Sequence, residues 1–172
     1  MKTPVRIVAV LSALVLAGSL AASTTTSAAD STSPGQRVAD CGGGHLKVRL
    51  GRLDAAAGSK YQAIRFTNTS GHRCVLKGYP RVTFRGKHHH RIGWPAKRVG
   101  RPAHAVVLRP GGTAKTALQI PNWRNYPAAD CHAKGSPRLR VVPPGTHRKV
   151  GFRYPAKTCT TKRGRSLVRP VH

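Results

Sequence analysis

The stretch from Tyr61 to Phe84 limits most strongly the folds that this chain can adopt. At its start the large apolar residues Ile64 and Phe66 alternate with polar or charged neighbours such as Arg65. A period of two residues indicates a half-buried β-strand, because the side chains of a strand point alternately to its two faces. The run Asn68-Thr69-Ser70-Gly71 then predicts a turn, since Asn and Ser bond to nearby backbone groups and Gly accepts a positive φ.

The rest of the chain repeats this pattern of short alternating segments separated by turn residues. Gly78-Tyr79-Pro80 breaks the chain because Pro lacks the N–H that a strand ladder uses, and Pro170 places the last candidate strand at a sheet edge. We expect residues 51–60 to be a connecting loop and no helix to follow the leader. About seven to nine short antiparallel strands are typical of a sandwich or barrel. The clearest candidates are residues 46–50, 62–67, 82–84, 104–108, 114–120, 138–142, 150–154 and 166–171.

Several of these motifs together are similar to those of a known family. They are Asn68-Thr69-Ser70-Gly71, Cys74, Leu76, Gly78-Tyr79-Pro80 and the segment Leu108 to Gly112. The set resembles the secreted actinobacterial family called domain of unknown function 4232, whose members are four-cysteine, immunoglobulin-like domains often carried on exported proteins or lipoproteins. The resemblance spans roughly Cys41 to the C-terminus and implies an immunoglobulin-like β-sandwich and an export route. It implies no activity, so no catalytic residue is transferred from it.

The N-terminus has the composition of a secretory signal peptide. Lys2 and Arg6 make its start positive, residues 7–22 are almost all apolar or small, and Ser27-Ala28-Ala29 offers small residues for cleavage. The apolar run is short for a membrane span of ~20 residues, and no lipid-attachment cysteine follows it. We therefore expect a secreted monomer, cleaved near Ala29, without a membrane anchor. The expected organisation is a signal peptide (1–29), a flexible spacer (30–40) and a single β-sandwich domain (41–172).

The four cysteines all lie in the part of the chain that is expected to be exported. An even number in an oxidising compartment predicts disulfides, for which four cysteines allow three pairings. The order of the strands favours Cys41–Cys74 and Cys131–Cys159, because in each pair one cysteine precedes an expected hairpin and the other follows it. Structural zinc is the alternative, although no two cysteines have the close spacing that such sites usually use.

The charge of the chain is strongly unbalanced. It has 31 Lys and Arg residues against 4 acidic residues, a net charge of +27. Any single outward-facing cation is ordinarily part of a solvated face, but ordinary surfaces mix both signs, and a polycation attracts polyanions by counterion release. We expect a basic binding module whose partners are anionic polymers such as teichoic acid or extracellular nucleic acid. The residues expected to contribute diffusely are Lys47, Arg49, Arg65, Arg81, Arg85, Lys87, Arg91, Arg140, Lys149 and Arg153.

Two further features contain residue types that bind ligands. The run from Lys87 through His88 and His90 to Arg91 includes common metal ligands. However, successive strand residues point to opposite faces and the flanking cations repel a metal ion, so we interpret it as a solvated loop and expect no metal or other cofactor. The aromatic residues among the cations could stack on bases or sugars, but we expect them to be partly buried loop anchors. They are Trp94, Trp123 and Tyr126.

Enzymatic functions fit the sequence poorly. With four Asp and no Glu, a carboxylate pair for glycoside hydrolysis is scarcely available, and neither a Gly-x-Ser-x-Gly motif nor a P-loop occurs. The least poor enzymatic alternative is a transpeptidase-like protein with Cys159 as nucleophile, a His base and Arg163, which requires a free thiol. The other alternative is a structural or protein–protein interaction module whose charge serves solubility. The sequence names no ligand, partner protein or process.

Overall fold

The computed structural model describes residues 37–172. The expected signal peptide and most of the expected spacer lie outside these residues. Within them the chain is mostly β, as predicted, and no helix is both long and apolar enough to cross a membrane. The strands are β1 (Leu46–Ala56), β2 (Ser59–Asn68), β3 (Cys74–Lys77), β4 (Arg81–Arg85), β5 (Arg91–Ile92), β6 (Lys97–Arg98), β7 (Ala105–Leu108), β8 (Thr113–Pro121), β9 (Lys134–Val142), β10 (Val150–Thr158) and β11 (Leu167–Val168). Short helical turns are η1 (Gly43–His45), η2 (Trp123–Asn125) and α1 (Ala128–Cys131).

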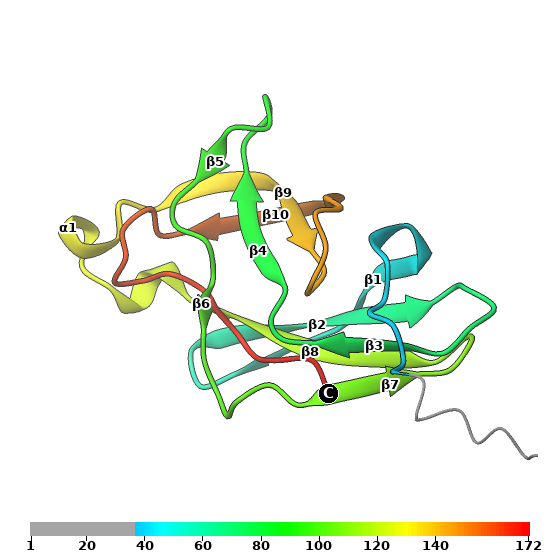
Figure 1. The fold of residues 1–172 in the computed structure, drawn as a ribbon. Helices are drawn as coiled ribbons and strands as arrows, with labels where there is room; N and C mark the ends of the chain where they lie inside the picture. Colours follow the sequence, from blue (N-terminus) through cyan, green and yellow to red (C-terminus); the bar gives the residue numbers. More distant parts are fainter. Residues whose placement is uncertain (1–36) are drawn as a thin grey trace, which may run out of the picture. The chain divides into compact units, whose positions relative to one another are not determined.

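These strands form three sheets around one core. The largest has the order β1-β2-β8-β11-β6, the second has the order β10-β9-β4-β5, and β3 pairs with β7. Figure 1 shows β4, β9 and β10 in one layer and β2 and β8 in another. Phe66 and Leu118 from the first sheet, Leu139 from the second and Leu76 from the third are buried in the same apolar cluster. Burial of this shared apolar surface stabilises the fold.

The expected loop at residues 51–60 is instead part of the β1–β2 hairpin, so that prediction is wrong. The two strands are joined by only two residues, Ala57 and Gly58, whose φ angles are 45° and 67°. Positive φ at both turn positions gives the twist that two-residue hairpin turns require. The register shifts between Leu50 and Leu53, and a bulge of this kind exchanges the faces of the strand. The alternation of the sequence is therefore lost although the strand continues.

The last strand, β11, also differs from the prediction. We expected an edge strand, but β11 lies inside the five-stranded sheet, antiparallel to β8 and parallel to β6. Pro170 does not interrupt it because the strand ends at Val168. The strand count exceeds the expected range because β5 and β6, which have only two residues each, are too short to show alternation. The single turn of helix α1 was likewise not predicted.

Two disulfides link the cysteines, in the pairs that the strand order favours. Cys41 is bonded to Cys74 and Cys131 to Cys159, and no free cysteine occurs in residues 37–172. Because all four sulfurs are bonded in this way, the zinc alternative does not apply. The loops that they close span 33 and 28 residues, for which chain entropy gives about 3.5 kcal/mol of stabilisation each. Two disulfides also indicate an oxidising, extracytoplasmic environment.

The end of β2 is fixed by the side chain of Asn68, which is fully buried. Its Nδ2 donates hydrogen bonds to the carbonyl of His72 at 2.7 Å and to that of Leu108 at 3.2 Å. Its Oδ1 accepts from the backbone N–H and the hydroxyl of Ser70, at 2.9 and 2.7 Å. One amide therefore holds together the turn after β2 and the end of β7, which are 40 residues apart.

Substitution of Asn68 by Ala should lower the free energy of unfolding by about 2 kcal/mol, because the buried carbonyl of Leu108 loses its donor and the turn at Ser70 loses its acceptor. The neighbouring Thr69→Ala variant is the control. Thr69 is exposed and makes one side-chain bond, to the carbonyl of His45 at 2.9 Å, so its loss should cost at most about 0.5 kcal/mol. Urea unfolding with the disulfides intact measures both; equal effects would contradict this role of Asn68.

Candidate anion-binding face

The four-stranded sheet has one buried face and one solvent face. Val82 and Phe84 of β4 and Leu139 and Val141 of β9 point into the core and are at most 3% exposed. Because side chains alternate along a strand, the residues between and beside them point outward. Four of these positions on β4 and β9 are arginines, Arg81, Arg85, Arg138 and Arg140, and the sequence predicted three of them; the other two, Thr83 and Val142, are buried.

Strand register aligns four of these cations across the sheet, one from each strand. Arg85 of β4 lies opposite Arg91 of β5 on one side and Arg138 of β9 on the other, and Arg138 lies opposite Arg153 of β10. We call Arg91, Arg85, Arg138 and Arg153 the arginine row. Neighbouring strands are about 4.8 Å apart, and like charges directly opposite one another destabilise a sheet. The row thus places four arginines at directly neighbouring positions of the sheet.

A shallow hollow lies beside the row. It has a volume of about 180 Å³, and the cations that line it are Arg81, Arg85, Arg91, Arg140 and Lys149. Gly151 lies opposite Arg140 on the neighbouring strand, and a Cβ there would meet nothing within 4 Å, so β10 leaves this side of Arg140 uncovered. We refer to the row together with Arg81, Arg140 and Lys149 as the basic face.

Arg85 is the most constrained cation of the basic face. Its Nε donates to the hydroxyl of Thr83 at 3.3 Å and its Nη1 to the carbonyl of His89 at 3.1 Å. Burial lowers the pKa of the Arg85 guanidinium, and the charges of Arg140, Arg91 and Arg81 lower it further. The folded protein therefore holds this charge at a free-energy cost that a bound anion would reduce.

The chain does not supply that anion within residues 37–172. Asp54 pairs with Arg52 at 2.6 Å and Asp130 with Arg163 at 2.8 Å, and neither arginine belongs to the basic face. Asp40 adjoins Cys41 and forms a β-bridge with Val75. In the part of the chain that the structure describes, the basic face is therefore not neutralised by a carboxylate in an ion pair.

The other predicted cations do not join this face. Arg49, Arg65 and Lys115 lie side by side on β1, β2 and β8 of the five-stranded sheet; with Lys47 they form a second group, the β1–β2–β8 cluster. Lys87 lies in the turn between β4 and β5, and its side chain is exposed. The site prediction omitted Arg138, although its shared parity with Arg140 on one strand could have revealed it.

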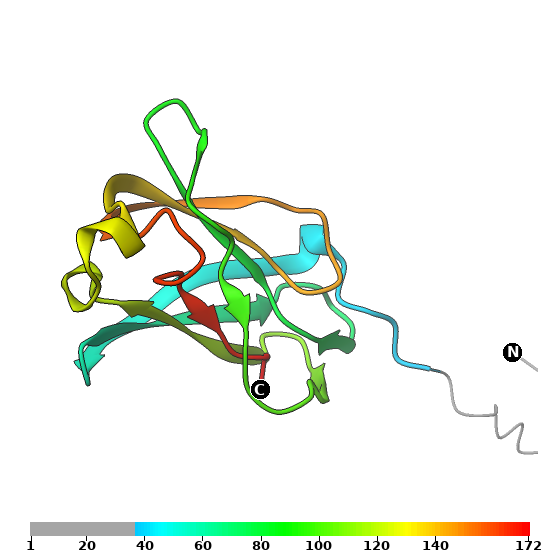
Figure 2. The ribbon, with the colours of Figure 1, turned by 90° about the vertical axis from the view of Figure 1, so that its left-hand side faces the viewer.

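The histidine run forms the tip of the β4–β5 hairpin. Gly86 N–H bonds to the carbonyl of His90 at 2.9 Å, and His88, His89 and His90 are exposed. Figures 1 and 2 both show this tip projecting from the sheet. No group of three or more metal-ligating side chains that could hold an ion occurs in the described region.

Each of the two tryptophan rings makes a cation–π contact with a lysine of the same chain. Lys162 Nζ lies 4.7 Å from the ring centroid of Trp94, and Lys157 Nζ lies 4.0 Å from that of Trp123. Trp123 is half-buried, whereas Trp94 is 43% exposed. Cys159, the nucleophile of the enzymatic alternative, is bonded to Cys131 and is therefore not a free thiol.

The Arg140→Gln substitution should raise the melting temperature at low ionic strength by about 1 °C, because it removes a repulsion worth a few tenths of a kcal/mol. Lys77→Gln is the control with the same charge change, since Lys77 lies opposite Ala105 in the two-stranded sheet. It should leave the melting temperature nearly unchanged, and high salt should remove the difference. A fall in the melting temperature of the Arg140 variant would contradict the repulsion.

Comparison with known proteins identifies the family of this β-rich, disulfide-linked chain. No curated protein matches it significantly. The sequence profile of the family described as Domain of unknown function (DUF4232) matches residues 41–172, from the first disulfide cysteine to the last residue. This match confirms the resemblance carried by the turn motifs and the cysteines. The chain therefore belongs to the DUF4232 family.

Proposed function

We propose that this protein is an exported, non-catalytic, strongly basic module that binds anionic polymers, with teichoic acid and extracellular nucleic acid as candidate partners. The observation that carries the proposal is the arginine row, in which Arg91, Arg85, Arg138 and Arg153 lie in register across four strands. A sheet ordinarily avoids such a line of like charges, or intersperses carboxylates. Its presence is accounted for if an external polyanion supplies the counter-charge.

The mechanism is electrostatic attraction with counterion release, strengthened by the geometry of arginine. Guanidinium groups present a planar fork of donors that binds phosphate oxygens in pairs. Rows of cations spaced about 4.8 Å across the strands and about 6.7 Å along them suit a polymer with a charge on every repeating unit. Lys47, Arg49 and Arg65 of the β1–β2–β8 cluster add diffuse attraction without sequence preference.

The rest of the proposal concerns the fold type and the compartment. We assign the sandwich to the immunoglobulin-like class, a view supported by the two larger sheets that share one core. Export is supported by the disulfides, which persist outside reducing compartments. A signal peptide cleaved near Ala29 and release without a lipid anchor are parts of the same proposal. The protein acts as a monomer in this account, because binding needs only one copy of the basic face.

The proposal predicts that affinity depends on the basic face rather than on net charge. The triple variant Arg81→Gln/Arg85→Gln/Arg140→Gln and the matched triple variant Arg49→Gln/Arg65→Gln/Lys115→Gln remove the same charge. In titrations of duplex DNA over a salt series, each lost phosphate contact reduces the log–log slope by about 0.9. We expect a reduction of about 2 to 3 for the first variant and of less than about 1 for the second.

Teichoic acid titrated in parallel distinguishes the candidate partners. If the affinities for both polymers fall steeply and equally with salt, the protein binds polyanions in general. If the affinity for one polymer persists at high salt, the protein has a specific site for that polymer. Equal losses for the two triple variants would show that only total charge matters. If wild-type protein binds neither polymer at low salt, the proposed function is wrong.

A further inference from the structure

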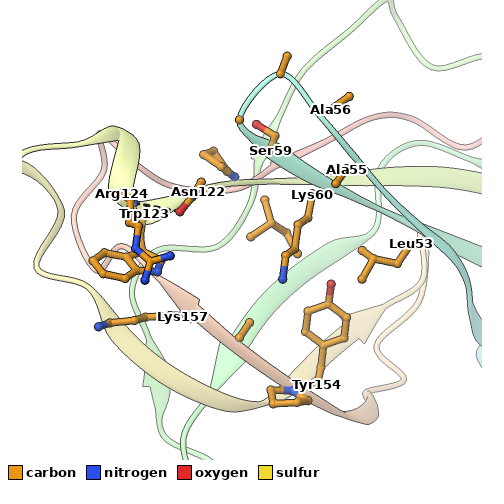
Figure 3. A pocket seen from close by; sticks show the side chains of 16 residues that line it. Leu53, Ala55, Ala56, Ser59, Lys60, Asn122, Trp123, Arg124, Tyr154 and Lys157 are labelled. Carbon is orange, nitrogen blue, oxygen red and sulfur yellow. Dashed lines mark hydrogen bonds between the residues drawn. The ribbon is translucent and has the colours of Figure 1, made fainter.

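The sandwich is open along one edge. The end of the β1–β2 hairpin and the later part of β10 form opposite walls of a cleft of about 980 Å³, which is closed at one end by Asn122, Trp123 and Arg124. Figure 3 shows side chains from both walls directed into this space. None of the residues that line it belongs to the basic face, so the cleft is a separate feature of the molecule.

The cleft exists because the core does not close between these two strands. Leu53, just beyond the bulge of β1, is 49% exposed. On β10 the inward residues Phe152, Tyr154 and Ala156 are only half-buried, whereas Leu139 on the neighbouring strand is fully buried. Apolar side chains left uncovered in this way can be buried further by a ligand that enters the cleft.

The lining combines apolar walls with three cations. Lys60, Arg124 and Lys157 are the charged side chains among the lining residues, and no carboxylate is among them. Lys157 Nζ and Arg124 Cζ lie 4.0 and 4.9 Å from the ring centroid of Trp123, which holds both cations at the same end. The apolar part of the lining consists mainly of Leu53, Ala55, Ala56, Ile120, Pro155 and Ala156.

The remaining polar groups favour an anionic ligand as well. In Figure 3 the Lys60 amine and the Tyr154 hydroxyl point into the space between the walls. The Tyr154 hydroxyl is protonated at neutral pH and is available as a hydrogen-bond donor, and burial raises its pKa further. Asp54, on the same strand as Leu53, is not a lining residue and pairs with Arg52.

We propose that this cleft binds a single-chain amphiphile with a carboxylate head, such as a medium- or long-chain fatty acid. The acyl chain lies between Leu53 and Tyr154, and the carboxylate is bound by Lys157 and Arg124 beside Trp123. The volume falls in the range of pockets that enclose small organic ligands. The inference does not depend on polyanion binding, because it uses different residues.

The test uses decanoate as the probe and Trp123 as the reporter. In a Trp94→Phe background Trp123 is the only tryptophan of the chain. Decanoate should change its emission saturably with a stoichiometry of one, and decanol, which lacks the charge, should bind about tenfold more weakly or worse. Calorimetric titration of the wild-type protein gives the same constants without the background substitution.

Matched variants locate the site. Leu53→Asn should weaken decanoate binding at least about tenfold, whereas Val107→Asn, which removes a side chain that is 52% exposed on β7, should not change it. Lys157→Gln should weaken binding, whereas Lys162→Gln, which removes the same charge beside Trp94, should not.

Three results would overturn the inference. The first is that decanoate does not bind saturably. The second is that Leu53→Asn and Val107→Asn change the affinity for decanoate equally. The third is that the wild-type protein sediments as a dimer and the Leu53→Asn variant as a monomer. The last result would mean that a second copy of the chain covers the cleft.

Discussion

The shortage of carboxylates is the constraint on which the rest of this structure depends. With 31 basic residues and 4 acidic ones, the chain can form few ion pairs and cannot neutralise its own surface. Its stability must come from interactions that are indifferent to charge: the apolar cluster shared by three sheets, two disulfides and the buried amide of Asn68. These interactions outweigh the repulsion on the surface.

The shortage of carboxylates also links the stability of the protein to its proposed function. The crowding of cations on the basic face is unfavourable for the isolated protein, since burial and the charges of Arg140, Arg91 and Arg81 lower the pKa of Arg85, and it favours a complex with a polyanion. Residues that serve binding at the expense of stability are a common feature of functional sites. The cleft beside Trp123 differs from the basic face, since there apolar surface is left uncovered and two of the three lining cations lie against one tryptophan ring.

Local sequence patterns predicted much of the fold. Alternation identified β2, β4 and β8, and the placement of the cysteines relative to expected hairpins gave both disulfide pairs. The bulge after Leu50 could not be predicted, because one extra residue reverses the pattern that defines a strand. The position of β11 inside the five-stranded sheet could not be predicted either. Its two residues are too few to show alternation, and its partners, β8 and β6, are distant in the sequence.

The candidate site was predicted only as a set of outward-facing cations. The sequence shows that Arg85 and Arg140 point away from a core, but it does not show that Arg91, Arg85, Arg138 and Arg153 align, because that depends on the register of four strands. The bond from Asn68 to the carbonyl of Leu108 and the cleft between β1 and β10 likewise arise from long-range packing. Such features follow from topology rather than from local pattern.

The central claim is that an external polyanion supplies the counter-charge that the basic face lacks. Hydrogen exchange of the backbone amides, with and without inorganic polyphosphate at constant ionic strength, tests it most directly. Because a ligand that binds only the native state stabilises that state, the account predicts slower exchange on addition of polyphosphate, greatest in β4, β5 and β9. Unchanged exchange in these strands, or slowing confined to the five-stranded sheet, would contradict it.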